Sequence, residues 1–164
     1  MTTITAAQDS DVDRLAQIWY DGWRDAHLII LPEALTRLRT LESFRDRLKA
    51  ALTDVRVAVA DAGLAGFVML KGDEVYQVYV AAEARGAGVA GALMDDAEAV
   101  LAARGVTTGW LACAIGNHRA ARFYEKRGWR RVGTVIYEAE TSAGPFPLEN
   151  WRYEKVLARP VKNQ

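Results

Sequence analysis

Residues that could form disulfides or bind a metal are scarce in this chain. The 164 residues include one cysteine, Cys113, and two histidines, His27 and His118. A single cysteine excludes an internal disulfide and a cysteine-rich metal site. Because the two histidines lie far apart in the sequence, we also expect no metal centre. Cys113 falls in a predicted buried strand, where we expect it to pack rather than react.

The chain also lacks net charge and long hydrophobic runs. It has 21 basic and 21 acidic residues, which gives a formal net charge of zero. This balance argues against general attraction to nucleic acid or to an anionic membrane. No apolar run has the length of a membrane span, and the first residues lack a charged signal region, so we expect a cytoplasmic protein. The length predicts a single domain that spans residues 1–164.

A strand, a glycine-spaced turn and a helix are predicted in residues 75–101. The strand is rich in β-branched and aromatic residues, and apolar residues recur at steps of three and four after Gly88, as in an amphipathic helix. Between the two, residues 85–90 read RGAGVA. A helix N-terminus has free N–H groups and a partial positive charge, both of which favour phosphate. The turn therefore predicts a binding site for a phosphorylated ligand, although a turn of this kind can also occur without one.

The spacing of the glycines distinguishes between classes of phosphate-binding motif. A P-loop requires GxxxxGK[ST], and a dinucleotide fingerprint requires GxGxxG at the first βαβ unit. The chain has no such P-loop, and its GxGxxG begins only at Gly86, in mid-chain. Residues 85–90 do fit the pattern [Q/R]xxGx[G/A] directly after a strand. In this segment the chain resembles the GNAT superfamily of acyl-coenzyme A-dependent N-acyltransferases.

Strands and helices are predicted along the rest of the chain from its periodicity and turn signals. Helices are expected at residues 11–27, at 33–52 as one or two helices with a break near Thr40, and at 117–127. Further strands are expected at residues 2–5, 55–60, 64–70, 107–115, 131–140 and 149–157. Because a helix connects them, the strands at 75–82 and 107–115 should be parallel, with a ligand crevice beyond their ends.

A second motif lies in residues 117–129. Asn117, Ala120, Tyr124, Glu125 and Gly128 match the GNAT pattern N-x-x-A-x-x-x-Y-E-x-x-G-F, with Trp129 in place of phenylalanine. The two motifs occur in the order that the family has and cover about a third of the chain. The resemblance implies an α/β GNAT fold, with a mixed, mostly antiparallel sheet of about seven strands, about four flanking helices and a splayed parallel central pair.

The resemblance implies that acetyl-coenzyme A is the cosubstrate, and no metal. Its pyrophosphate would bind the loop amides, its pantetheine arm would pair with the backbone at Val78 and Val80, and the thioester carbonyl would accept a hydrogen bond from the Val80 N–H. The cofactor-binding residues predicted in this way are Val78, Tyr79, Val80, Arg85, Gly86, Ala87, Gly88, Val89, Ala90, Asn117, Arg119 and Tyr124.

The family match also makes Tyr124 the general acid. The departing thiolate has a pKa of roughly 8.5 by analogy with cysteine, and a phenol with a pKa near 10 can donate a proton to it. Packing in the core is the alternative role for an aromatic residue on this helix.

The general base is less well defined by the sequence. Many relatives carry an acid on the central strand where this chain has Tyr76. Glu74 shares the predicted face of Tyr76 because strand side chains repeat every two residues, and it could act through a water molecule. Other candidates for the base are Asp21, His27, Glu138 and Glu140.

Trp23, His27 and Tyr76 are the candidate substrate-binding residues. Aromatic faces favour a cationic amine, although Tyr20, Trp23 and His27 also fit a helix edge packed in the core. Six basic residues follow between positions 119 and 131, and one or two of them could bind coenzyme A phosphates; the alternative is a solvated helix face. These residues are Arg119, Arg122, Lys126, Arg127, Arg130 and Arg131.

The sequence therefore predicts an N-acetyltransferase in which an amine attacks acetyl-coenzyme A directly. The expected partner is a small-molecule or peptide amine, with no nucleic acid and no membrane, and a homodimer stays open. A non-catalytic acyl-coenzyme A-binding module of the same fold, and a structural domain that has lost the ligand, are the alternatives. The sequence does not identify the acceptor.

Overall fold

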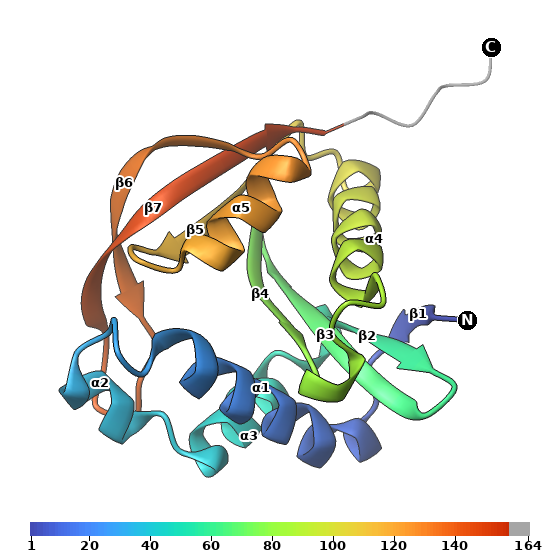
Figure 1. Ribbon diagram of the computed structural model, residues 1–164, viewed down its shortest axis with the longest axis horizontal. Coiled ribbons are helices and arrows are strands. Elements are labelled where there is room, and N and C mark those ends of the chain that lie inside the picture. The colour runs from blue at the N-terminus through green and yellow to red at the C-terminus, as the bar shows by residue number, and fades with distance from the viewer. Residues whose placement is uncertain (158–164) are drawn as a thin grey trace.

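The structure is a computed structural model and describes residues 1–157. A seven-stranded sheet runs through the molecule (Figure 1). The strand order is β1-β2-β3-β4-β5-β7-β6, and only β4 and β5 are parallel neighbours. The strands are β1 (Thr3–Ala6), β2 (Val55–Ala60), β3 (Gly63–Lys71), β4 (Glu74–Val80), β5 (Thr108–Ala114), β6 (Arg130–Ala139) and β7 (Phe146–Val156). The predicted mixed, mostly antiparallel sheet of seven strands is therefore confirmed.

Five α-helices flank this sheet in the described part of the chain. They are α1 (Val12–His27), α2 (Glu33–Leu38), α3 (Leu41–Ala50), α4 (Val89–Ala103) and α5 (His118–Lys126), and short 3-10 turns lie at Asp9–Asp11, Leu52–Asp54 and Ala82–Ala84. The predicted break near Thr40 separates α2 from α3, because the Thr40 side chain accepts a hydrogen bond from the Ser43 N–H and caps α3. No helix among residues 1–157 is long and apolar enough to cross a membrane.

Two hydrophobic cores form on opposite faces of the sheet. Along β3, Phe67 and Met69 belong to one core, while Val68 and Leu70 belong to the other, as the alternation of a strand requires. Residues of α1, α2 and α3 fill the first core, and residues of α4 and α5 pack in the second. The sheet is thus covered on both faces, which explains why its central strands are apolar on both sides.

The sheet opens in the middle, between β4 and β5. Glu74 and Trp110 form the single residue pair between these strands, and β4 and β5 then run apart (Figure 1). The register of β4 against β3 shifts by one residue, because Gln77 pairs with Met69 and Val75 pairs with Leu70. Tyr76 is the additional residue. Such a bulge bends and twists its strand, so it accounts for the divergence of β4 from β5.

Candidate active site

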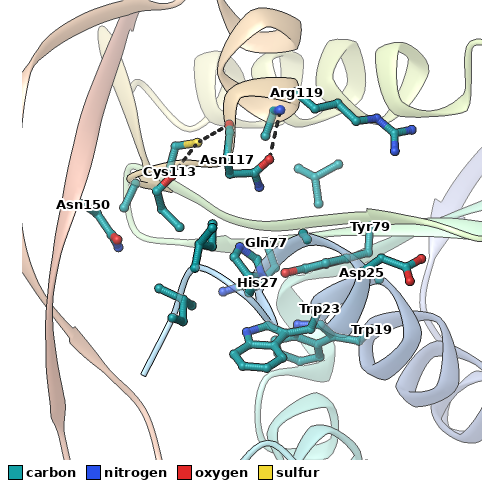
Figure 2. Close-up of a pocket in the computed structure, with 18 of the residues that line it drawn as sticks. Trp19, Trp23, Asp25, His27, Gln77, Tyr79, Cys113, Asn117, Arg119 and Asn150 are labelled. Carbon is teal, nitrogen blue, oxygen red and sulfur yellow. Dashed lines mark hydrogen bonds between the residues drawn. The ribbon is translucent and has the colours of Figure 1, made fainter. Parts of the chain in front are cut away.

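A cavity of about 590 Å³ lies at the opening between β4 and β5. It is lined by residues 74–80 of β4 and by side chains of α1, β5, α5, β6 and β7. Figure 2 shows Cys113, Asn117 and Arg119 on one side of this space and Trp19, Trp23 and His27 on the other. The divergence of the two strands therefore creates a deep site that reaches from α5 to α1.

The glycine-spaced loop at the mouth of this site presents free backbone amides. Gly86 and Gly88 have φ values of 82° and 81°, and a Cβ on either residue would meet open space. Gly88 is the N-cap of α4, and no side chain caps the helix. The N–H groups of residues 86–91 have no acceptor among residues 1–157. They are thus available to an external anion.

The open edge of β4 leads from this loop into the cavity. The Ala81 N–H donates to the Ala65 carbonyl of β3 at 2.8 Å. Because backbone N–H groups alternate in direction along a strand, those of Val78 and Val80 point away from β3, toward the gap. The backbone at Val78 and Val80 can therefore pair with an extended ligand.

Helix α5 forms the opposite wall. Its N-cap, Asn117, accepts a hydrogen bond from the Ala120 N–H at 3.2 Å, which fixes the start of the helix beside the cavity. Tyr124 lies two turns along and lines the cavity. Its hydroxyl has no hydrogen-bond partner within residues 1–157, so it can donate to a ligand.

Burial raises the pKa of Tyr124 above that of an ordinary tyrosine, so this phenol stays protonated at neutral pH. Burial also raises the pKa of Cys113, in the same cavity, to about 12. Cys113 is therefore a thiol rather than a reactive thiolate. A thiolate released from a ligand here would face the same desolvation, which makes it a stronger base than a thiolate in water.

Glu74 is the buried acid of the site. Its side chain lines the cavity and is only 4% exposed. Burial raises the pKa of Glu74 to about 7, and the Tyr137 hydroxyl, which donates to Oε1 at 3.3 Å, opposes this rise. A carboxylate with a pKa near neutrality can both take up and release protons at physiological pH.

Aromatic side chains form the wall on the α1 side. Trp23, His27 and Tyr76 line the cavity, and the Trp23 and His27 ring centroids are 5.4 Å apart. Burial lowers the pKa of His27 to about 4, so its ring is neutral at pH 7. Tyr20 does not line this cavity and packs at the edge of the α1 core.

The structure brings together most of the residues predicted for the site. The cavity lining contains both predicted catalytic residues, the three predicted substrate-binding residues and eight of the predicted cofactor-binding residues: Val78, Tyr79, Val80, Arg85, Ala90, Asn117, Arg119 and Tyr124. The Tyr79 side chain turns toward Gly22 of α1, where burial raises its pKa. Gly86, Ala87, Gly88 and Val89 do not line the cavity and lie at its mouth.

The other candidates for the base are distributed differently. His27 is in the cavity lining, whereas Asp21, Glu138 and Glu140 are exposed and are absent from it. Asp21 accepts a hydrogen bond from Gln17, and Glu140 pairs with Lys71. Glu74 is thus the carboxylate with the closest access to the cavity and with a suitable pKa.

The predicted run of basic residues does not form one surface. Arg127 pairs with Asp95 and donates to the Gly91 carbonyl, and Arg131 lies over the Trp151 ring at 3.8 Å. Arg119 reaches the cavity lining. Arg122, Lys126 and Arg130 are exposed and form no ion pair with residues 1–157.

Tyr137, Arg39, Arg47 and Asn150 also line the cavity and were missed by the sequence analysis. Asn150 is 8% exposed, and its Oδ1 is buried without a hydrogen-bond partner in the described residues. These residues come from segments far apart in the chain, and no local motif marks them. Arg39 follows a short helix and Arg47 lies on another, where charged side chains are usually solvated.

A comparison with protein families identifies the family of this chain. The model of the Acetyltransferase (GNAT) family matches residues 13–129. The chain belongs to the GNAT acetyltransferase family. As a GNAT N-acetyltransferase it is an acyltransferase, and its family uses acetyl-coenzyme A to acetylate amine acceptors. The match covers both motifs, and it confirms the resemblance found in the sequence.

Individual relatives agree with this assignment. The GNAT chain is 32% identical over 117 residues to an uncharacterized N-acetyltransferase of Mycobacterium tuberculosis, which covers 66% of this chain and 75% of the relative. A GCN5-related N-acetyltransferase structure from Rhodopseudomonas palustris shares 21% identity with a TM-score of 0.76, covering 96% of both chains. A PaiA N-acetyltransferase from Thermoplasma acidophilum, solved in complex with coenzyme A, shares 19% identity with a TM-score of 0.65, covering 95% of this chain and 99% of that one. These two structures confirm the fold.

Proposed function

We propose that this protein transfers an acetyl group from acetyl-coenzyme A to a primary amine, which attacks the thioester directly. The observation that carries the proposal is the continuous path from the free amides of residues 86–91, along the backbone of Val78 and Val80, to Glu74 and Tyr124 in the cavity. Acetyl-coenzyme A supplies an activated acyl group with a thiol as its leaving group.

The residues at the mouth and along β4 fit such a cosubstrate. The amides of residues 86–91 would hold the pyrophosphate, and a Cβ at Gly86 or Gly88 would have forced a strained backbone there. Arg119 and the free amide nitrogen of Asn117 would bind the pantetheine side. Arg85 pairs with Asp25 at 3.1 Å, so this side chain ties the loop to α1.

Backbone N–H groups of β4 would stabilise the developing oxyanion of the thioester carbonyl. Both Val80 and Val78 direct their N–H groups into the gap. Val78 lies two residues nearer Glu74 along β4, so it is better placed for a thioester that an amine attacks beside that carboxylate. We therefore assign the oxyanion contact to the Val78 N–H. The sequence analysis had assigned it to the Val80 N–H.

Two side chains would move protons. Glu74 would accept a proton, through water, from the ammonium form of the acceptor, so that the neutral amine can attack, and its pKa of about 7 suits this role. The Tyr124 hydroxyl would donate its proton to the departing sulfur. Burial in this cavity raises the pKa of a thiol, as it does for Cys113, and this partly offsets the raised pKa of Tyr124 in the transfer.

A thiol-release assay with acetyl-coenzyme A across a panel of amines tests the proposal. The panel should contain polyamines, aminoglycosides, amino acids and peptides with free N-termini. Thiol release that depends on one class of amine supports transfer. Tight coenzyme A binding in a calorimeter without thiol release on any amine would instead identify an acyl-coenzyme A-binding module, and absence of binding would remove both interpretations.

A further inference from the structure

Two arginines in the cavity have buried N–H groups without partners. Arg39 follows α2 and is 5% exposed; its Nη1 donates to the Glu140 backbone carbonyl. Arg47 lies on α3, and its Nη2 donates to the Tyr76 hydroxyl at 2.8 Å. Arg39 Nε and Arg47 Nε and Nη1 are buried with no hydrogen-bond partner among residues 1–157. Both side chains line the same cavity as Glu74.

No carboxylate in the described residues neutralises either arginine. Neither forms a salt bridge, and the nearby Glu140 pairs with Lys71 at 3.0 Å. Burial lowers the pKa of Arg39 to about 10, and the positive charge of Arg47 acts in the same direction. Buried charges are usually paired, because an unpaired one is costly.

Packing accounts for only part of this arrangement. The Arg47 guanidinium lies over the Trp19 ring at 4.3 Å, and such a cation–π contact stabilises the charge. A ring face does not satisfy N–H donors in the guanidinium plane, however. Arg39 has no ring contact of this kind among the described residues. The free donors of both residues therefore need a hydrogen-bond acceptor from outside the described residues.

The two arginines are connected to the proposed base by a row of contacts. Arg47 bonds the Tyr76 hydroxyl, the Tyr76 and Tyr137 rings stack with centroids 6.3 Å apart, and the Tyr137 hydroxyl bonds Glu74. The N–H donors of Arg47 therefore lie at one end of this series of contacts, and the Glu74 carboxylate lies at the other end.

We propose that Arg39 and Arg47 bind an anionic oxygen group, a carboxylate or a phosphate, carried by the amine that this enzyme acetylates. Guanidinium groups match the geometry of both anions. The amine end of the same molecule would lie toward Glu74. His27, which is neutral and has an unpartnered Nδ1, lines the cavity beside Arg39 and adds no further charge. This assignment of the substrate class rests on the proposed function.

Matched pairs of acceptors test the proposal in the thiol-release assay. Amino acids and ω-amino acids such as β-alanine are compared with their carboxamides, and phosphoethanolamine is compared with ethanolamine. The anionic member of at least one pair should have a kcat/KM about tenfold to a hundredfold higher, the range for charge-assisted hydrogen bonds. The first pair reports a carboxylate and the second a phosphate.

Three variants separate the arginine pair from general effects. Arg39→Gln and Arg47→Gln should each reduce the ratio of kcat/KM between the anionic and neutral acceptors. Because the same acceptors are used with each protein, the change in this ratio from wild type to variant does not depend on amine basicity. Arg45→Gln is the matched control, because Arg45 lies on the same helix, pairs with Asp13 at 2.8 Å and is outside the cavity lining. It should leave the ratio unchanged.

A calorimetric titration supplies a readout that does not depend on turnover. Wild-type protein saturated with coenzyme A is titrated with glutarate and with glutaramide. We expect glutarate to bind and glutaramide not to bind, and we expect Arg39→Gln to lose the binding of glutarate. This result would support the anion site even if no acceptor in the panel is acetylated. Equal kcat/KM within both acceptor pairs, together with no heat from glutarate, would overturn the inference. Acetylation of neutral amines would in that case leave the proposed function standing. If both variants fail to fold, the wild-type acceptor ratios and the wild-type titration still decide.

Discussion

The Tyr137 hydroxyl of β6 donates a hydrogen bond to Glu74 Oε1 of β4 at 3.3 Å, across two strands that are not neighbours in the sheet. This contact crosses the opening between β4 and β5 and holds a buried carboxylate at the apex of the divergence. Burial and this single hydrogen bond act on the pKa of Glu74 in opposite directions. The balance makes Glu74 sensitive to small changes in its surroundings.

Glu74→Gln should lower kcat/KM and remove one ionisation from its pH dependence. In the wild type, the rate should rise as the pH increases through about 7, because only the ionised carboxylate accepts a proton. The amine acceptor contributes its own ionisation in both proteins, so the difference between the two pH profiles isolates Glu74. Identical profiles would mean that the base is another group.

Glu74→Gln should lower activity but raise the free energy of unfolding at pH 8. The pKa of Glu74 in the folded protein, about 7, exceeds its ordinary value of 4.5, so between these pH values the folded state holds a proton that the unfolded state has released. The free energy of unfolding of the wild type therefore falls as pH rises through this window, by up to about 3 kcal/mol. Denaturant titrations should show Glu74→Gln to be more stable than the wild type at pH 8, with little difference at pH 4.

Tyr137→Phe should move the acid limb of the pH–rate profile to higher pH. The lost hydrogen bond stabilises the ionised form of Glu74, so without it the pKa of Glu74 rises further, by a few tenths to about one unit. A double-mutant cycle with Glu74→Gln is the control. If Tyr137→Phe shifts the profile equally when the carboxylate is absent, Tyr137 does not act through Glu74.

Tyr124→Phe should lower turnover by about 10²-fold or more while leaving the affinity for coenzyme A nearly unchanged, since the hydroxyl acts on the leaving group. Tyr153→Phe is a suitable control: its ring centroid lies 6.2 Å from that of Tyr124, but its hydroxyl bonds Arg131 and it does not line the cavity. Stopped-flow thiol release and calorimetry measure the two quantities. Unchanged turnover in Tyr124→Phe would remove Tyr124 from the mechanism.

Gly88→Glu should abolish coenzyme A binding, because a carboxylate at the start of α4 adds bulk and repels phosphate. Gly105→Glu gives the same backbone strain at the other end of the helix, since Gly105 has a φ of 87° and open space around its Cα. Calorimetry with coenzyme A compares the two. Binding retained by Gly88→Glu, or lost equally in both, would contradict the position proposed for the pyrophosphate.

Local sequence patterns predicted the elements, and the family resemblance pointed to many of the residues that line the cavity. The glycine-spaced loop, the helix predicted at residues 117–127 and the parallel pair all depend on neighbouring residues, so periodicity and turn chemistry reveal them. The bulge at Tyr76 and the contact of Tyr137 with Glu74, 63 residues apart, depend on tertiary packing. The position of Arg39 and Arg47 in the cavity lining likewise depends on how α2 and α3 dock, which charge patterns in a helix do not predict.

Strand β7 joins β5 to β6, although it follows both of them in the chain. During synthesis on the ribosome, β5 and β6 therefore emerge before the partner that lies between them. Their backbone groups stay open to misdirected pairing until residues 146–156 have left the exit tunnel. Because Asn150 of this strand also lines the cavity, the cavity is completed only after β7 has been synthesised, later than the glycine-spaced loop at residues 85–90.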